Sequence, residues 1–327
     1  MKSTIVKIIS QSKYILSLFI LMMIIIFASI ISPSFLRVSN IITIIRQASI
    51  LLILSSGLTV VVLTGGIDLS VNAVAGLVGC IAAQLMVREA SILTAVLAGL
   101  LVGIITGMLN GILVSLLHLP PFIATYGTSM VVSGLAVMVM RGQVIYGLPD
   151  RFVYVGIGWL YGIPVPVIIA IVVVAILFIV LKKTIFGRNV YMIGSNIYAA
   201  KYSGMRDVRL LITVYVISGI TAAIGGLIMA ARLNAADANM GNAYGLQVVA
   251  AVVIGGTSMF GGEGGMAGTV IGAMVLTIIA NLMNLVGLSS FLQPSAVGAI
   301  IIIMVSIDIM LKSKVEEISA ASVTKKT

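Results

Sequence analysis

The sequence predicts an all-α integral membrane protein with about ten transmembrane helices, some of them short or broken. Hydrophobic residues make up 61% of the 327 residues and charged residues only 9%, whereas a soluble domain carries about a quarter charged residues. The apolar residues form long runs, and most basic residues gather in three polar stretches. None of these stretches is long enough for a separate catalytic domain.

The predicted spans follow from the length of the apolar runs, because a helix needs roughly 20 apolar residues to cross a bilayer and somewhat fewer where it is broken. The ten segments are 14–31, 47–64, 71–87, 90–117, 121–140, 165–181, 210–233, 246–256, 264–287 and 294–311. The eighth is too short to cross alone. The first follows three lysines, as a signal peptide would, but no small-residue cleavage site clearly ends it. We expect a transmembrane domain over 14–311 between a tail at 1–13 and a tail at 312–327.

The basic residues predict the orientation of the chain. Thirteen of the 19 Lys and Arg lie in residues 1–13, in the segment 182–209 and in the tail that starts at Lys312. Cytoplasmic loops carry this excess of positive charge, so we expect both termini and the 182–209 loop on the cytoplasmic side of the membrane. The connection 141–164 then lies outside, with aromatic residues suited to the interface. The net charge of +10 is therefore explained by the orientation of the chain in the membrane, and no nucleic-acid partner is expected.

A polar break separates the second and third segments. The apolar run ends at Thr64 and meets Gly65 and Gly66, where the backbone is free to leave helical geometry. Asp68 and Ser70 follow, and both residue types cap a new helix well. Interrupted helices often mark the solute path of a transporter. Asp68 has two open roles: a helix cap, or a gate or ion site, since buried charge in membranes is often functional.

Two predicted helices carry glycine faces, and the chain repeats one short pattern. Glycines spaced by four occupy positions 99, 103, 107 and 111 of one segment and 264, 268 and 272 of another. Such faces let neighbouring helix backbones approach closely. The sequence VVLTGG at 61–66 resembles AVVIGG at 251–256, and repeated halves with paired broken helices are common in transporters. The match is too short to decide whether the halves are parallel or inverted.

Uncharged polar residues within the predicted spans are candidates for the substrate path. Amides and hydroxyls exchange hydrogen bonds with a polyol without trapping a charge. The alternative role is hydrogen bonding between helices, worth about 1 kcal/mol each. Together with the break, the candidate path residues are Gly65, Gly66, Asp68, Asn72, Asn110, Thr125, Gln247 and Asn281.

Several kinds of chemistry are absent from the sequence. No Gly-x-x-x-x-Gly-Lys-Ser/Thr loop occurs, so the chain has no standard phosphate loop for ATP. One cysteine (Cys80) and one histidine (His118) cannot assemble a metal-ligand set. No nucleophile and base are recognisable together. We predict a protein that is not an enzyme by itself and binds no metal or cofactor.

The 182–209 loop contains a short capped segment, GSNIYAAKYSG at 194–204. Ser195 or Asn196 is suited to start a helix there and Gly204 to end it. A capped basic helix on the cytoplasmic face is suited to dock a soluble partner. An ordinary interfacial helix is an equally good interpretation.

Four stretches in order give the chain a resemblance to the membrane permeases of bacterial ABC importers for simple sugars, the ribose permease group, over almost its whole length. They are LTGGIDLSV at 63–71, PPFIATYG at 120–127, the 194–204 segment, and GGTSMFGG at 255–262 with Gly268 and Thr269. The resemblance implies a type II-like ABC importer permease. The GGIDLS pattern is similar to the sugar branch rather than to the related branched-chain amino acid and nucleoside permeases.

The resemblance also implies partners. These are a second permease copy or homologue that forms a dimer, ATP-binding cassette subunits that use ATP and Mg, and a periplasmic or lipid-anchored sugar-binding protein. In the family the segment matching 194–204 meets the ATPase, which assigns coupling to Asn196, Ala199, Lys201, Ser203 and Gly204. Two positions depart from the family pattern and concern these contacts: Ile197, where the family often has Glu, and Glu263, where it often has a basic residue.

The leading hypothesis is therefore a permease subunit that moves a ribose-like pentose or a hexose by alternating access. The alternatives are an autonomous secondary carrier, with Asp68 in proton coupling, a passive channel, or a permease for a related solute such as autoinducer-2 or a nucleoside. The binding protein sets most of the selection in such systems, so this chain does not name the sugar.

Overall fold

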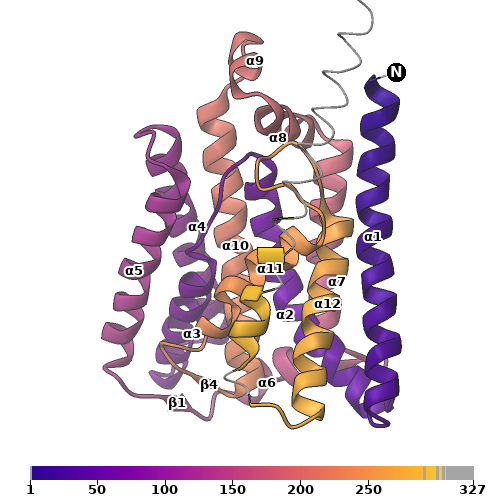
Figure 1. Ribbon diagram of the computed structural model, residues 1–327. Helices are drawn as coiled ribbons and strands as arrows, with labels where there is room; N and C mark the ends of the chain where they lie inside the picture. The colour runs from indigo at the N-terminus through magenta and orange to yellow at the C-terminus, as the bar shows by residue number, and fades with distance from the viewer. Residues whose placement is uncertain (1, 290–291, 300–301, 304–305, 307–327) are drawn as a thin grey trace, which may run out of the picture.

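Helices run side by side in the molecule (Figure 1), and among the described residues six helices are long and apolar enough to cross a membrane. The computed structural model describes residues 2–289, 292–299, 302–303 and 306. The six are α2 (Val38–Leu63), α4 (Ile92–Ser115), α5 (Pro121–Met140), α7 (Val165–Lys183), α10 (Asp207–Leu233) and α12 (Met266–Leu285). The predicted all-α membrane fold is confirmed.

Three shorter apolar helices complete the part of the bundle that the structure describes. They are the apolar part of α1 (Lys2–Ile31), α3 (Val71–Val87), and α11 (Gly245–Ile254) with the 3₁₀ turn η1 (Asn242–Tyr244) before it. Nine of the ten predicted segments thus correspond to observed helices. Half of the tenth, 294–311, falls outside the described residues.

Two helices begin earlier than the apolar runs predict. α1 starts at Lys2 rather than at residue 14, and α2 starts at Val38 rather than at residue 47. The start of α2 mixes polar residues with apolar ones, and polar side chains there have partners. Arg46 donates to the carbonyl of Ile157 at 2.9 Å and lies 4.9 Å from the ring centre of Trp159. The helix therefore continues beyond the hydrophobic stretch on which the prediction was based.

The glycine face of α4 is confirmed as a packing surface against α10. A β-carbon at Gly103 would overlap the carbonyl oxygen of Gly219, and one at Gly107 would overlap the carbonyl oxygen of Tyr215. Of the other predicted face, Gly268 and Gly272 lie in α12 beside α11. Gly264 precedes α12 and has φ +118°, which is not helical. The prediction that Gly264 belongs to this helical face was therefore wrong.

The connection 141–164 and the segment 182–209 lie at opposite ends of the bundle (Figure 1). The first holds elements that the sequence did not predict. α6 (Asp150–Ile157) follows strand β1 (Ile145–Tyr146), which pairs with β4 (Ala235–Ala236). Strands β2 (Trp159–Leu160) and β3 (Ile163–Pro164) form a small hairpin before α7. These short elements tie the connection to the end of α10.

The chain re-enters the bundle after β4, which explains why α11 is short. Gly241 lies against the carbonyl of Asn72 in the first turn of α3, and Gly79 faces Met240. Residues 237–244 thus lie along α3, and α11 covers the remaining distance. α11 runs parallel to α2, because Ser55 donates to the carbonyl of Val248 at 3.5 Å and the carbonyl of Leu63 accepts from Gly262 at 2.9 Å. The repeated VVLTGG pattern therefore marks parallel elements.

Candidate functional site

The break between α2 and α3 is a non-helical hinge loop at residues 64–70. Gly65 adopts φ +79° directly after the last turn of α2, a conformation that costs glycine little and other residues more. Gly66 has no positive φ, and a β-carbon there would lie 2.9 Å from the hydroxyl oxygen of Tyr215 and 3.2 Å from Cγ1 of Val61. The two glycines thus serve different needs: Gly65 turns the chain, and Gly66 makes room for α10.

Asp68 is buried at the centre of the hinge loop, with 3% of its surface exposed. Its Oδ1 accepts from the backbone N–H of Ser70 at 2.9 Å and from the Ser70 hydroxyl at 2.6 Å. Its Oδ2 accepts from the hydroxyl of Ser218 on α10 at 2.7 Å. Each partner donates, which suits the acceptor-only carboxylate. Asp68 therefore fastens the start of α3 to α10.

The predicted capping of α3 holds in part. Asp68 accepts the N–H of Ser70, the residue just before the helix, as an Asx turn does. Ser70 itself makes no side-chain cap, so that part of the prediction was wrong. The Ser70 hydroxyl donates to Asp68 instead, and it accepts no hydrogen bond from the backbone N–H groups in the first turn of α3.

Asn110 and Thr125 join the same cluster from α4 and α5. Asn110 Nδ2 donates to Ser70 Oγ at 2.8 Å and lies 3.5 Å from Asp68 Oδ1. Asn110 Oδ1 is buried without a hydrogen-bond partner among the described residues. Thr125 Oγ1 accepts from the N–H of Leu69 at 3.1 Å. Side chains from three helices, α4, α5 and α10, thus meet the hinge loop. We name Asp68, Ser70, Asn110, Thr125 and Ser218 the hinge cluster.

The remaining candidate path residues lie elsewhere. Asn281 exchanges two hydrogen bonds with Asn40, at 3.0 and 2.8 Å, near the start of α2 and therefore at its opposite end from the hinge loop. This pair joins α2 to α12, as interhelical amide bonds do in membranes. Asn72 is half-buried with its amide facing Gly245, and Gln247 is half-buried in the first turn of α11. Five of the eight predicted residues thus lie in the hinge loop or contact it, Asn72 follows it in the first turn of α3, and Gln247 and Asn281 lie on other helices.

The hinge loop begins near the end of the bundle that carries α8 (Ile185–Ser195) and α9 (Ile197–Tyr202) (Figure 1). A β-carbon at Gly194 would overlap the carbonyl oxygen of Leu63 and lie 2.5 Å from the amide of Gly262. Gly65 in turn faces the carbonyl of Phe260 at 3.3 Å from its β-position. α8 is therefore in backbone contact both with the end of α2 and with the connection that precedes α12. The sequence did not predict α8 as a separate helix.

A cavity of about 300 Å³ lies between the hinge loop and this end of α10. Its lining includes Thr64, Gly65 and Gly66 on one side and Lys201 and Asp207 on the other. Lys201 Nζ and Asp207 Oδ2 form an ion pair at 3.2 Å that links α9 to the first turn of α10. The hinge loop thus has free space beside the helix that was predicted to couple to the ATPase.

α9 is the short capped helix that the sequence predicts. The Asn196 side chain accepts from the N–H of Ala199 at 3.0 Å, and Gly204 has φ +77° just after the helix. Ala199 and Ser203 are exposed, whereas Ala200 is fully buried. Two aromatic residues that the sequence analysis did not single out, Tyr198 and Tyr202, are 73% and 92% exposed. Their spacing of four along the helix could have indicated an exposed aromatic face.

The apolar helices, the non-helical break between α2 and α3 and the close glycine packing define a multi-pass membrane protein. A family model described as the permease component of branched-chain amino acid transport systems matches residues 40–307. The chain belongs to this permease family. The resemblance inferred from its motifs is confirmed at that level.

Named relatives cover nearly the whole chain. It is 41% identical over 295 residues to the ribose import permease protein RbsC of Bacillus subtilis (strain 168), covering 90% of this chain and 91% of that protein. It is 37% identical to RbsC of Haemophilus influenzae (90% and 92%). It is 36% identical to the D-allose transport system permease protein AlsC of Escherichia coli K12 (86% and 87%). No solved structure matches the chain.

Proposed function

We propose that this chain is the permease subunit of an ATP-binding cassette importer for a monosaccharide, a ribose-like pentose or a hexose. Two of the relatives just described are named as ribose import permeases and one as a D-allose permease. The chain shares more than a third of its residues with each over most of its length. The choice of ribose or another sugar is therefore a question for direct uptake measurements.

The structural observation that supports this function is the contact of α8 with two breaks in the bundle. Gly194 lies against the end of α2 and against Gly262 of the connection before α12. A soluble ATPase that binds α8 and α9 would act directly on both connections. Separate ATPase subunits would use ATP and Mg, and this chain would bind neither.

The proposed orientation places α8, α9 and both terminal tails (1–13 and 312–327) in the cytoplasm of a bacterial inner membrane. The basic residues of 182–209 support this orientation through the positive-inside rule. The opposite end, with α6 and the two small strand pairs, would then face a periplasmic or lipid-anchored sugar-binding protein. A second permease copy or a homologue would complete the translocation path.

Alternating access in this proposal changes the position of the hinge loop relative to α10. The hinge cluster would hold the start of α3 while the cavity beside Thr64 and Lys201 gives the first half of the loop room to move. Asp68 has a structural role here, because all its hydrogen bonds join protein elements to one another. The proposal therefore assigns it no proton transfer.

The test is uptake of labelled sugar by proteoliposomes that contain the permease, its cognate ATPase and its binding protein. We expect ribose or allose to accumulate above the external concentration only with ATP and Mg on the ATPase side. Uphill uptake by the permease alone under a pH gradient would contradict the proposal and support a secondary carrier. Equilibration without accumulation would support a channel.

A further inference from the structure

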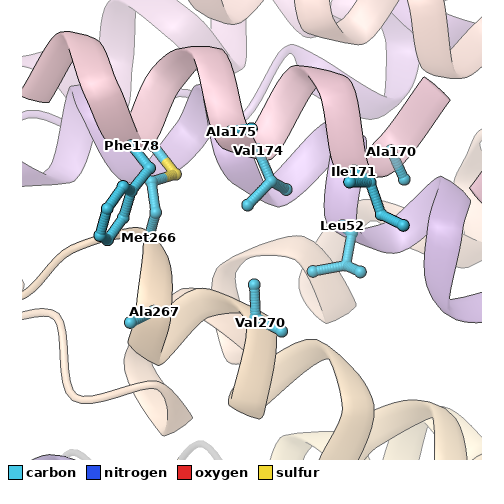
Figure 2. A pocket seen from close by; sticks show the side chains of 9 residues that line it. All are labelled: Leu52, Ala170, Ile171, Val174, Ala175, Phe178, Met266, Ala267 and Val270. Atoms are coloured by element: carbon cyan, nitrogen blue, oxygen red, sulfur yellow. The ribbon is translucent and has the colours of Figure 1, made fainter. Parts of the chain in front are cut away.

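An apolar groove opens on the side of the bundle between α7 and α12. Both helices pack along α2, but they diverge from each other and leave a space of about 480 Å³. Figure 2 shows Leu52 of α2 at its base, Val174 and Phe178 on the α7 side, and Met266 and Val270 on the α12 side. Its lining residues are all apolar.

A second cavity of about 240 Å³ continues this groove toward α8. The two share Phe178, Met266 and Ala267 in their linings. The second cavity is also lined by Lys182, the only charged residue of its lining, and by Tyr191 of α8. Lys182 Nζ lies 4.6 Å from the ring centre of Phe178, so the cation is held at the junction of the two cavities. An apolar slot thus ends in a positively charged mouth.

The orientation of this site relative to the bilayer follows from α7. Lys182 lies in the last turn of α7, at the end of the bundle that carries α8, where lipid headgroups are expected. The apolar lining extends back along α7 from Phe178 to Ala170, a distance of about 12 Å at the rise of an α-helix. That length is about four-fifths of the roughly 15 Å hydrocarbon depth of one leaflet.

We propose that this groove, together with its Lys182 mouth, binds one anionic phospholipid of the leaflet beside α8. An acyl chain lies along Val174 and Val270, and the phosphate lies at Lys182. Basic pockets between transmembrane helices are the usual sites for acidic headgroups. A sugar does not fit, because the groove offers a polyol no hydrogen-bonding side chain.

The charge at the mouth is tested by Lys182→Gln, with Lys183→Gln as the matched control, since Lys183 is exposed but outside both linings. The full chain is purified in detergent, incubated with phosphatidylglycerol or phosphatidylcholine, and examined by native mass spectrometry. We expect phosphatidylglycerol retention by Lys182→Gln to fall about fivefold and retention by Lys183→Gln to remain unchanged. Equal loss in both variants, or equal retention of the two lipids by the unmodified chain, would overturn the proposal.

The groove itself is tested by filling it. Ala175 lines the groove and is exposed, and the neighbouring Ile176 is 54% exposed but outside the lining. Ala175→Trp should displace the retained lipid, whereas Ile176→Trp should keep it, with both variants purified in equal yield. Undiminished retention by Ala175→Trp would overturn the proposal.

A cysteine at the same position tests the other occupant, a second copy of the chain. The native Cys80 is fully buried, so a surface cysteine can be crosslinked selectively. We expect no Ala175→Cys homodimer after oxidation in membranes. Efficient dimer formation through this position would show that a second permease covers the groove, and would overturn the lipid assignment.

Discussion

Two connections of the bundle begin with the same pattern and are then built differently. The hinge loop (64–70) follows α2, and the glycine-rich connection (255–265) follows α11. A glycine of nearly equal φ follows each helix, +79° at Gly65, the first glycine of its pair, and +81° at Gly256, the second of its pair. The hinge loop is then held by side chains from several helices, through Asp68 and Thr125.

The glycine-rich connection is held by bonds within itself and by bonds to α2 and α8. Gly262 N–H donates to the carbonyl of Leu63, and the Tyr191 hydroxyl donates to the carbonyl of Gly264, each at 2.9 Å. Four more of its glycines have positive φ, at 261, 262, 264 and 265. Ser258 N–H donates to the carbonyl of Glu263 at 3.0 Å, and Gly265 N–H donates to Thr257 Oγ1 at 3.3 Å. The comparison teaches that damage to the hinge loop should spread to α4, α5 and α10, whereas damage to the glycine-rich connection should spread to α2 and α8. The two meet at Gly194.

The largest effect is expected where both connections are affected together. Gly194→Ala places a β-carbon against the carbonyl of Leu63 and the amide of Gly262. Since this is contact with backbone, the helix has to shift. We expect ATP-dependent uptake in proteoliposomes to fall at least about tenfold, a loss of about 1.4 kcal/mol or more in coupling.

The matched control for Gly194→Ala is Gly127→Ala on α5, where a new β-carbon meets no atom within 4 Å. Uptake by this control should be unchanged. If Gly194→Ala also transports normally, α8 does not act on the two connections through this contact.

The next largest effect concerns Asp68. Asp68→Ala leaves Ser70 and Ser218 without their acceptor, and each buried group left unpaired costs about 1–3 kcal/mol. We expect less folded transporter in the membrane and a lower melting temperature of the purified protein.

Asp68→Asn is the companion variant, because Asn keeps an oxygen for the Ser70 amide and its NH₂ can donate to Ser218. Most uptake should remain. Normal assembly with abolished uptake in Asp68→Asn would show that the negative charge itself is required.

A smaller and more selective effect is expected at Gly66. Gly66→Val adds bulk within 2.9 Å of the Tyr215 hydroxyl, and its branched side chain restricts the loop further. We expect uptake to fall more than the amount of folded protein in the membrane. Gly134→Val on α5, where the space is open, is the control, and equal loss of folded protein and uptake at Gly66 would assign the glycine to packing alone.

The smallest effect is expected at the Asn40–Asn281 pair, which lies far from both connections. Asn281→Leu removes two interhelical hydrogen bonds, worth about 0.6–2 kcal/mol in membranes. The melting temperature should fall slightly, while uptake per folded molecule remains unchanged. A selective loss of uptake would return Asn281 to the substrate path.

These differences show which features the sequence could predict. The length of the apolar runs identified nine helices, because the thickness of the bilayer sets the length of each spanning helix separately. The positions of Asn196 and Gly204 identified α9, since capping and left-handed turns are local requirements. α6 and α8 were missed because both are short and lie at the ends of the bundle. Helices there do not cross the membrane, so the length of an apolar run does not identify them.

The candidate site was predicted only in part for a similar reason. Asp68, Asn110 and Thr125 were recognised as polar residues in apolar segments, and the structure brings them together. The same reasoning also selected Asn281, whose partner Asn40 lies in the start of α2 that the predicted span left out. Ser218 was missed because a serine in a transmembrane helix commonly bonds only its own backbone. Which polar residues meet is decided by helix packing, which spacing within one helix does not reveal.

The proposed function requires that a separate ATPase drive this permease through α9. Ala199 and Ser203 are exposed on that helix, so Ala199→Trp and Ser203→Trp should leave membrane insertion and binding-protein docking intact. A bulky side chain that costs a few kcal/mol at the interface with the ATPase weakens association of the two proteins by orders of magnitude.

The measurement is co-purification of the ATPase with each variant, together with substrate-stimulated ATP hydrolysis. Ala200→Trp, at a fully buried position, serves as the control that should lose folded protein instead. Loss of both ATPase association and stimulation in the Ala199 and Ser203 variants is the predicted result. Unchanged association and stimulation in both would contradict the docking of an ATPase on α9.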